Sequence, residues 1–235
     1  MLFLGATLLA AIAACVQGTI GFGLALTSAP LLALIDPAFV PGPLLVASAP
    51  MAVAVLLRER EHADVRGVTA AFAGRLPGTA MGALAVAALP VLVLHVAIGI
   101  VVLLAVAVSL WAPRFHPTTP VLVGAGVVSG VTGTVAAIGG PPIALVYQYA
   151  GGPTVRATMS LYFVLGTALS IAALWLAGAF GRHELDLSLV LIPGTALGFL
   201  ASGPLLGRID AARLRVLVLA AAAVSAVLLL VTALV

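Results

Sequence analysis

Long apolar segments fill most of this chain, and they restrict it to a fold inside a membrane. Short connections between the segments carry nearly all of the charged residues. A hydrocarbon core of about 30 Å needs about 20 apolar residues per helix, and 63% of the residues are hydrophobic while only 7% are charged. Because strand-like alternation is absent, we expect helices and not a barrel. The eight segments cover residues 2–35, 40–57, 68–89, 91–112, 119–150, 157–180, 187–206 and 214–235. We predict an all-α integral membrane protein with a single transmembrane domain, residues 1–235.

Two glycine- and proline-rich stretches occupy corresponding places in the chain, residues 18–30 and 130–142. A shift of 112 positions places Gly18 on Gly130 and Gly21 on Gly133. Further along, residues 77–82 match residues 193–198 at a shift of 116 positions. The sequence therefore predicts two homologous halves of four apolar segments each, about 1–113 and 114–235. Broken helices in corresponding places are the sequence sign of a transporter site.

The apolar segments that contain these stretches are too long for one straight membrane helix. Segment 2–35 has 34 residues, which would extend about 51 Å at 1.5 Å per residue. We predict a broken helix or helical hairpin at each, with unwound tips near mid-membrane at 18–23 and 130–140. A hairpin returns the chain to the side from which it came, so each half crosses three times and the second half is inverted.

The arginines support the inverted arrangement over eight plain spans. Eight plain spans leave five arginines on one side and four on the other, Arg75 set aside. The inverted arrangement instead leaves Arg182 alone on one side, which is the asymmetry typical of a cytoplasmic face, and it places both termini outside. The arginines on the predicted cytoplasmic side are Arg58, Arg60, Arg66, Arg114, Arg156, Arg208, Arg213 and Arg215.

Several motifs resemble one known family over nearly the whole chain. Gly21-Phe22-Gly23 leads to Pro30-Leu31-Leu32, and Gly139-Gly140-Pro141-Pro142 is followed by Arg156-Ala157-Thr158. These residues are similar to the two repeat signatures of the TauE/SafE sulfite exporter family. The resemblance implies a multi-pass permease of the bacterial inner membrane for sulfur-containing anions, such as sulfite or organosulfonates.

Unwound helix ends buried in a membrane have a chemical use. The N-terminus of a helix presents free N–H groups and a partial positive charge, so two tips that meet near the midplane form a cradle for an anion. The alternative is that these glycines only allow tight helix packing. The predicted substrate-binding residues are Gly18, Thr19, Gly21, Phe22, Gly23, Gly130, Thr132, Gly133, Thr134, Gly139, Gly140, Pro141 and Arg75.

Arg75 is the one charge near the middle of an apolar segment, and its place there has two interpretations. An intramembrane arginine is costly and indicates a functional site, and guanidinium suits an oxyanion. Alternatively, the helix begins near Gly74 and Arg75 extends to the cytoplasmic interface. The GxxxG pairs Gly78/Gly82 and Gly194/Gly198 are expected to serve close helix packing.

The remaining residues argue against an enzyme. We find no catalytic set: residues 183–187 lack the second His of HExxH, and a single cysteine excludes a cysteine metal cluster. We expect no cofactor and no bound metal, and the scattered arginines do not indicate nucleic acid. Because no Lys or Arg precedes Arg58, residues 1–14 are expected to be retained in the first helix.

The sequence thus favours a transporter of small anions in contact with the lipid bilayer, and it leaves a homo-oligomer open. An inside-negative potential favours anion export by about 2.3 kcal/mol per charge per 100 mV. Since no carboxylate lies well inside an apolar segment, uniport or facilitated export by alternating access is the expected mechanism. The alternative is a membrane accessory or assembly protein that transports nothing itself.

Overall fold

The computed structural model describes residues 2–20, 23–111, 115–205 and 211–234, and these residues are helical with short connections. The first half contains α1 (Leu2–Ile20), α2 (Leu24–Ile35), α3 (Gly42–Glu59), α4 (Val65–Ala88) and α5 (Val91–Trp111). The second half contains α6 (Thr119–Ala136), α7 (Gly140–Val146), α8 (Gly152–Leu176), α9 (Arg182–Leu205) and α10 (Ala211–Leu234). Two short 3-10 turns, Pro37–Phe39 and Arg60–His62, flank α3. The prediction of an all-α protein is confirmed for this part of the chain.

Seven helical stretches of the described residues are long and apolar enough to cross a membrane. α4 has 24 residues, which is long enough to cross, but it is not among the seven. α2 and α7, with 12 and 7 residues, are too short to span a bilayer. The seven stretches are Leu2–Thr19, Pro37–His62, Val91–Trp111, Thr119–Ala136, Gly152–Leu176, Arg182–Gly203 and Arg213–Leu234.

The two overlong apolar segments are interrupted, as the sequence predicts, but the breaks are shorter than expected. α1 ends at Ile20 and α2 begins at Leu24, while α6 ends at Ala136 and α7 begins at Gly140. Gly23 has φ 119° and Ala137 has φ 60°, and the value at Gly23 is one that glycine adopts most readily. α1 packs against α2, and α6 packs against α7.

The prediction that the whole of 18–23 and 130–140 is unwound is therefore wrong. Gly18 and Thr19 lie in the last turn of α1. In the second stretch Gly130, Thr132, Gly133 and Thr134 lie in α6. Gly130 serves helix packing and does not unwind α6, because a Cβ there would lie 2.7 Å from the Arg75 carbonyl oxygen of α4.

Each half is packed largely on the other half. α1 lies along α9 and α6 lies along α4, while α3 packs on α8 and α5 on α10. The GxxxG glycines make the first two contacts close: a Cβ at Gly78 would overlap the Val127 carbonyl, and one at Gly198 would overlap the Ala11 carbonyl. The prediction that these pairs serve close helix packing is confirmed.

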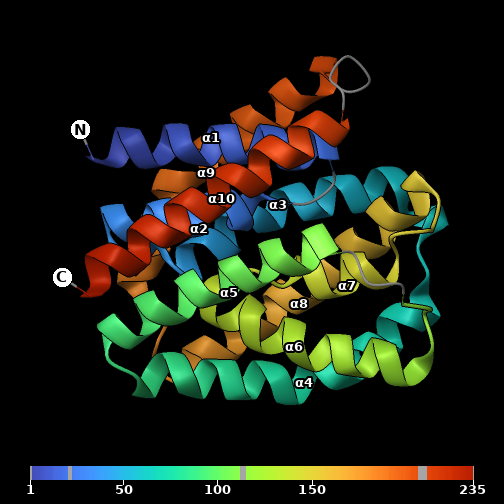
Figure 1. Ribbon diagram of the computed structural model, residues 1–235, viewed down its shortest axis with the longest axis horizontal. Coiled ribbons are helices and arrows are strands. Elements are labelled where there is room, and N and C mark those ends of the chain that lie inside the picture. The colour runs from blue at the N-terminus through green and yellow to red at the C-terminus, as the bar shows by residue number, and fades with distance from the viewer. Residues whose placement is uncertain (1, 21–22, 112–114, 206–210, 235) are drawn as a thin grey trace.

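The start of α1 and the end of α10 lie at the same end of the molecule (Figure 1). The connection between α3 and α4 lies at the opposite end.

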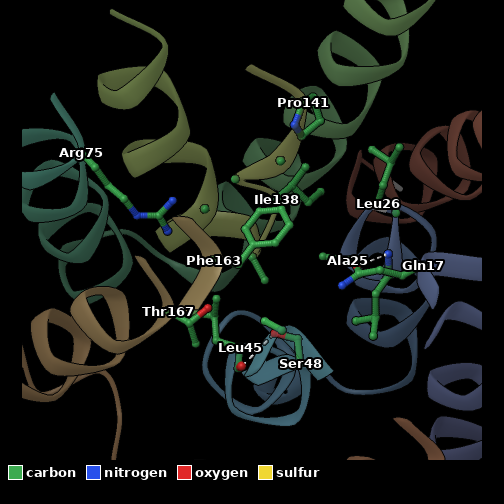
Figure 2. Close-up of a pocket in the computed structure, with 17 residues that line it drawn as sticks. Gln17, Ala25, Leu26, Leu45, Ser48, Arg75, Ile138, Pro141, Phe163 and Thr167 are labelled. Carbon is green, nitrogen blue, oxygen red and sulfur yellow. Dashed lines mark hydrogen bonds between the residues drawn. The ribbon is translucent and has the colours of Figure 1, made fainter. Parts of the chain in front are cut away.

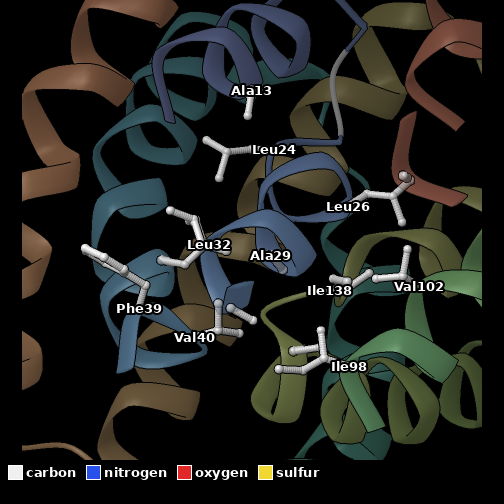
Figure 3. Close-up of a cluster of buried hydrophobic side chains, with 14 of the residues drawn as sticks. Ala13, Leu24, Leu26, Ala29, Leu32, Phe39, Val40, Ile98, Val102 and Ile138 are labelled. Carbon is white, nitrogen blue, oxygen red and sulfur yellow. The ribbon is translucent and has the colours of Figure 1, made fainter. Parts of the chain in front are cut away.

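The larger apolar core surrounds α2. Leu24, Ala29 and Leu32 of α2 are almost completely buried, and Phe39 packs into the same cluster. Ile138, from the second break, belongs to this cluster and lies beside Val102 of α5 (Figure 3). Residues at both breaks therefore pack into the same apolar core.

Candidate functional site

A small cavity of about 50 Å³ lies where the two helix breaks approach each other. The first break contributes Gly23 and Leu24, and the second contributes the stretch 137–141. α3 and α8 complete the wall with Leu45, Ser48, Ala52, Phe163 and Thr167, and Gln17 of α1 and Arg75 of α4 also line it. In Figure 2 Arg75 and Gln17 approach from opposite sides and the ring of Phe163 stands between them.

Arg75 is the charged side chain of this cavity, and it is only 2% exposed. α4 begins at Val65, so Arg75 lies nearly three turns inside the helix. The alternative that α4 begins near Gly74, leaving Arg75 to extend to the interface, is therefore wrong. Nη1 donates to Ser129 Oγ at 3.1 Å, and Nη2 donates a weaker bond to Ser170 Oγ at 3.5 Å. The guanidinium carbon lies 4.7 Å from the centre of the Tyr162 ring, within the range of a cation–π interaction.

Three glycines leave the space that the guanidinium fills. A Cβ at Gly166 would overlap the guanidinium carbon itself. A Cβ at Gly133 would lie 3.1 Å from Nη2, and a Cβ at Gly139 would lie 3.1 Å from Nη1. Glycines of α6, of α8 and of the second break therefore shape a socket for Arg75.

The socket supplies neutral partners but no negative charge. Among the described residues, no carboxylate forms an ion pair with Arg75, and its buried Nε has no hydrogen-bond partner. A buried cation is expensive unless a charge or hydrogen bonds compensate it. Two hydroxyls and one aromatic face compensate it only in part, so the cavity beside Arg75 favours an anion.

Both serines that hold Arg75 are themselves anchored to the surrounding helices. Ser129 Oγ donates to the Gly139 carbonyl oxygen at 2.5 Å, which ties α6 to the second break. Ser170 Oγ and Thr134 Oγ1 lie 2.9 Å apart and share a hydrogen bond. The guanidinium is therefore fixed in position by a network that crosses α4, α6 and α8.

Backbone donors at the breaks are fewer than the sequence suggests. The Leu24 N–H, at the start of α2, donates to Gln17 Oε1 at 2.9 Å. Pro141 and Pro142 stand in the first turn of α7, and proline has no N–H. Free backbone donors are therefore few at the breaks, and the Arg75 guanidinium is the charged group among the described lining residues.

Only some of the predicted site residues line the cavity. Gly23, Arg75, Gly133, Gly139, Gly140 and Pro141 line the cavity, whereas Gly18 lines a neighbouring cavity described below. The Thr19 hydroxyl donates to a backbone carbonyl of α1. The Thr132 hydroxyl donates to one carbonyl of α6 and one of the second break, and Thr134 shares a hydrogen bond with Ser170. Gly130 packs on α4. Gly21 and Phe22 lie outside the described residues.

Sequence reasoning missed Ser129, Ser170, Phe163 and Thr167. A signal for three of them is present, because Phe163, Thr167 and Ser170 follow one another at the spacing of one helix face. Without a known partner for that face, isolated hydroxyls in an apolar helix do not stand out.

Comparison with known proteins gives one match. The family model described as Sulfite exporter TauE/SafE matches residues 6–229, nearly the whole chain. No curated protein and no solved structure matches. The match agrees with the resemblance of the two repeat signatures and with the apolar helices of the fold. The chain therefore belongs to the TauE/SafE sulfite exporter family and is a multi-pass membrane transporter.

Proposed function

We propose that this transporter is a permease for small sulfur-containing anions of the sulfite or organosulfonate class, and that the anion binds beside Arg75. The observation that carries this proposal is a guanidinium 2% exposed at the cavity wall, with no carboxylate paired to it among the described residues. A bound oxyanion supplies the missing charge, and the planar donor group suits its geometry.

The packing of the helices supports an inverted repeat of halves 1–113 and 114–235. Each half gives its first helix to the other half, since α1 pairs with α9 and α6 with α4. The start of α1 and the end of α10 share one end of the molecule (Figure 1), as an inverted repeat with two helical hairpins requires. Movement of one half against the other would then open the cavity alternately to the two sides.

Side-chain contacts also support the predicted distribution of arginines. Glu59, at the end of α3, pairs with Arg156 at the start of α8, so these residues share one end of the bundle. A Cβ at Gly42, at the opposite end of α3, would meet Phe180 and lie near Glu184. We place the end with Arg58 and Arg156 in the cytoplasm of a bacterium, with the protein in the inner membrane.

The mechanism follows from the absence of a carboxylate beside Arg75 in the described part of the chain. We propose uniport, because no carboxylate or histidine stands among the described residues that line the cavity, and such a group would be needed to pair anion movement with a proton. The same lining offers no nucleophile with a base, which favours a transporter without catalytic activity.

Flux measurements in proteoliposomes test the function directly. The purified protein is reconstituted and offered sulfite, sulfate, thiosulfate and small organosulfonates, with protein-free liposomes and the Arg75→Leu variant as controls. We expect at least one of these anions to move with the wild-type protein and not with Arg75→Leu. A folded wild-type protein that moves none of them would leave the accessory or assembly protein as the better interpretation.

A further inference from the structure

A second, smaller cavity continues from the Arg75 cavity toward the end of the bundle that carries Arg58 and Arg156, the arginine-rich end. It has a volume of about 10 Å³, and its wall includes Gly18, Val55, Arg58, Arg156 and Ser160. Gln17, Ala52 and Phe163 line both cavities. The two spaces are therefore neighbours that share one wall.

The residues of both cavities form matching stripes on two helices. On α8 the stripe consists of Arg156, Ser160, Phe163, Thr167 and Ser170, at alternating steps of four and three residues. Such steps place side chains on one face of a helix. The stripe begins at the arginine-rich end and finishes at the serine that bonds to Arg75.

α3 supplies the facing stripe in the opposite direction. Leu45 and Ser48 line the Arg75 cavity, and Val55 and Arg58 line the outer one. α3 packs directly on α8. The side chains that line the two cavities between these helices therefore connect Arg58 with Arg75.

The outer end of this line carries a net positive charge. Glu59 Oε1 accepts from Arg58 Nη2 at 2.9 Å, and Glu59 also accepts from Arg156 Nε at 2.9 Å. Two guanidinium groups thus share one carboxylate. A positive opening with apolar walls raises the local concentration of anions and increases their rate of arrival.

We infer that the anion reaches Arg75 along α3 and α8, through an outer anion site formed by Arg58, Arg156 and Ser160 and past a constriction formed by Phe163. This inference rests on the proposed function and adds a second binding site to it. Phe163 suits the role because it belongs to both cavities, and because its ring would lie 3.2 Å from a Cβ added at Gly140. The outer site takes the same class of ligand, a small oxyanion.

Cysteine labelling tests the outer site without requiring transport. Cys15 is the sole cysteine, so Cys15→Ala gives a background in which Ser160→Cys is the single thiol. Purified protein is treated with a methanethiosulfonate that carries a sulfonate and, separately, with one that carries a trimethylammonium group. We expect the ratio of anionic to cationic labelling rates to fall by about tenfold in Arg58→Gln/Arg156→Gln.

Two controls separate charge from structure. Arg156→Lys keeps the charge and is expected to keep the ratio, and Arg182→Gln removes an arginine from the opposite end and is expected to leave the ratio unchanged. A ratio that does not respond to Arg58→Gln/Arg156→Gln overturns the outer site, even if the wild-type protein transports anions. A ratio that responds while no anion moves in proteoliposomes supports the outer site and contradicts the proposed function instead.

A second labelling experiment tests the constriction. In the same background Thr167→Cys is expected to react slowly, and Phe163→Ala is expected to accelerate its reaction with the anionic reagent by about tenfold or more. Phe199→Ala is the matched control, since Phe199 lies on α9 and lines a different, apolar groove against α3. Phe163→Leu replaces Phe163→Ala if the latter does not fold. Unchanged labelling of Thr167→Cys in a folded Phe163 variant contradicts the constriction.

Discussion

Replacement of Arg75 by methionine separates a binding role from a structural one. Methionine has a similar length but no charge, so the Tyr162 ring keeps a neighbour. Neither serine partner loses its last hydrogen bond, because Ser129 still donates to Gly139 O and Ser170 still pairs with Thr134. The change also removes a buried cation that has no carboxylate partner among the described residues. We therefore expect the melting temperature of Arg75→Met to equal or exceed that of the wild type.

Transport should respond in the opposite direction. A hydrogen bond to a charged group contributes about 1.5–3 kcal/mol, and each 1.4 kcal/mol corresponds to about tenfold in affinity. Loss of one such bond to the anion lowers the flux at low substrate concentration by about 10- to 100-fold. Arg75→Lys keeps the charge without the planar donor pair, so an intermediate flux is expected.

The assay compares initial flux in proteoliposomes with the thermal unfolding of the same preparations. Flux that persists in Arg75→Met refutes a role for the guanidinium in anion binding. A fall in flux that merely follows a fall in melting temperature assigns Arg75 to the stability of the bundle.

Four further experiments test the fold around this site. Cysteines that replace Glu61 and Glu184 should label from opposite sides of the membrane, and labelling from one side contradicts the inverted arrangement. Gly198→Ala brings a Cβ into the backbone of α1. It should lower the free energy of unfolding by about 1–3 kcal/mol, and with it the melting temperature. Gly140→Ala meets the side chains of Phe163 and Met159 on α8 and no backbone among its nearest atoms, so it should impair transport before stability; the reverse order contradicts the site. Tyr147→Phe removes a 2.7 Å hydrogen bond to the carboxylate of Asp64, which caps α4. It should lower the free energy of unfolding by about 1–3 kcal/mol, measured by thermal unfolding.

The same tyrosine gives a pH dependence with a definite sign. Burial and the neighbouring Asp64 carboxylate raise the pKa of Tyr147 above its ordinary value of 10.0. The contribution of this group to stability is therefore complete below about pH 10 and is lost as the pH rises further. The loss of stability above pH 10 should be smaller in Tyr147→Phe than in the wild type, and equal losses contradict the assignment.

Much of the fold follows from sequence patterns because those patterns are set by the apolar interior of the bilayer. The apolar segments, their lengths and the two interruptions are all dictated by the thickness of a bilayer, and the structure has them. The extent of the unwound tips was wrong, because glycine in a membrane helix serves two purposes that composition does not separate. Gly23 has a backbone angle that favours glycine, whereas Gly130 makes room for α4.

The candidate site was predicted only in part, for a related reason. Arg75 stands out by its charge in an apolar segment, and its partner hydroxyls do not. Ser129 and Ser170 lie 54 and 95 residues away in the chain. Only the packing of α4 against α6 and α8 brings them to the guanidinium, and no local pattern reveals which helix faces which.

The exchange of first helices between the halves has a consequence for synthesis of the chain. Thr7 of α1 donates a hydrogen bond to the Val190 carbonyl of α9, 183 residues later. At a synthesis rate of about 5–20 residues per second, roughly 10–40 s pass before α9 exists. Throughout that time the small-residue face of α1 has no permanent neighbour. Lipid or the insertion machinery must cover it until the last third of the protein emerges, so a chain truncated before α9 should be a target for membrane proteases.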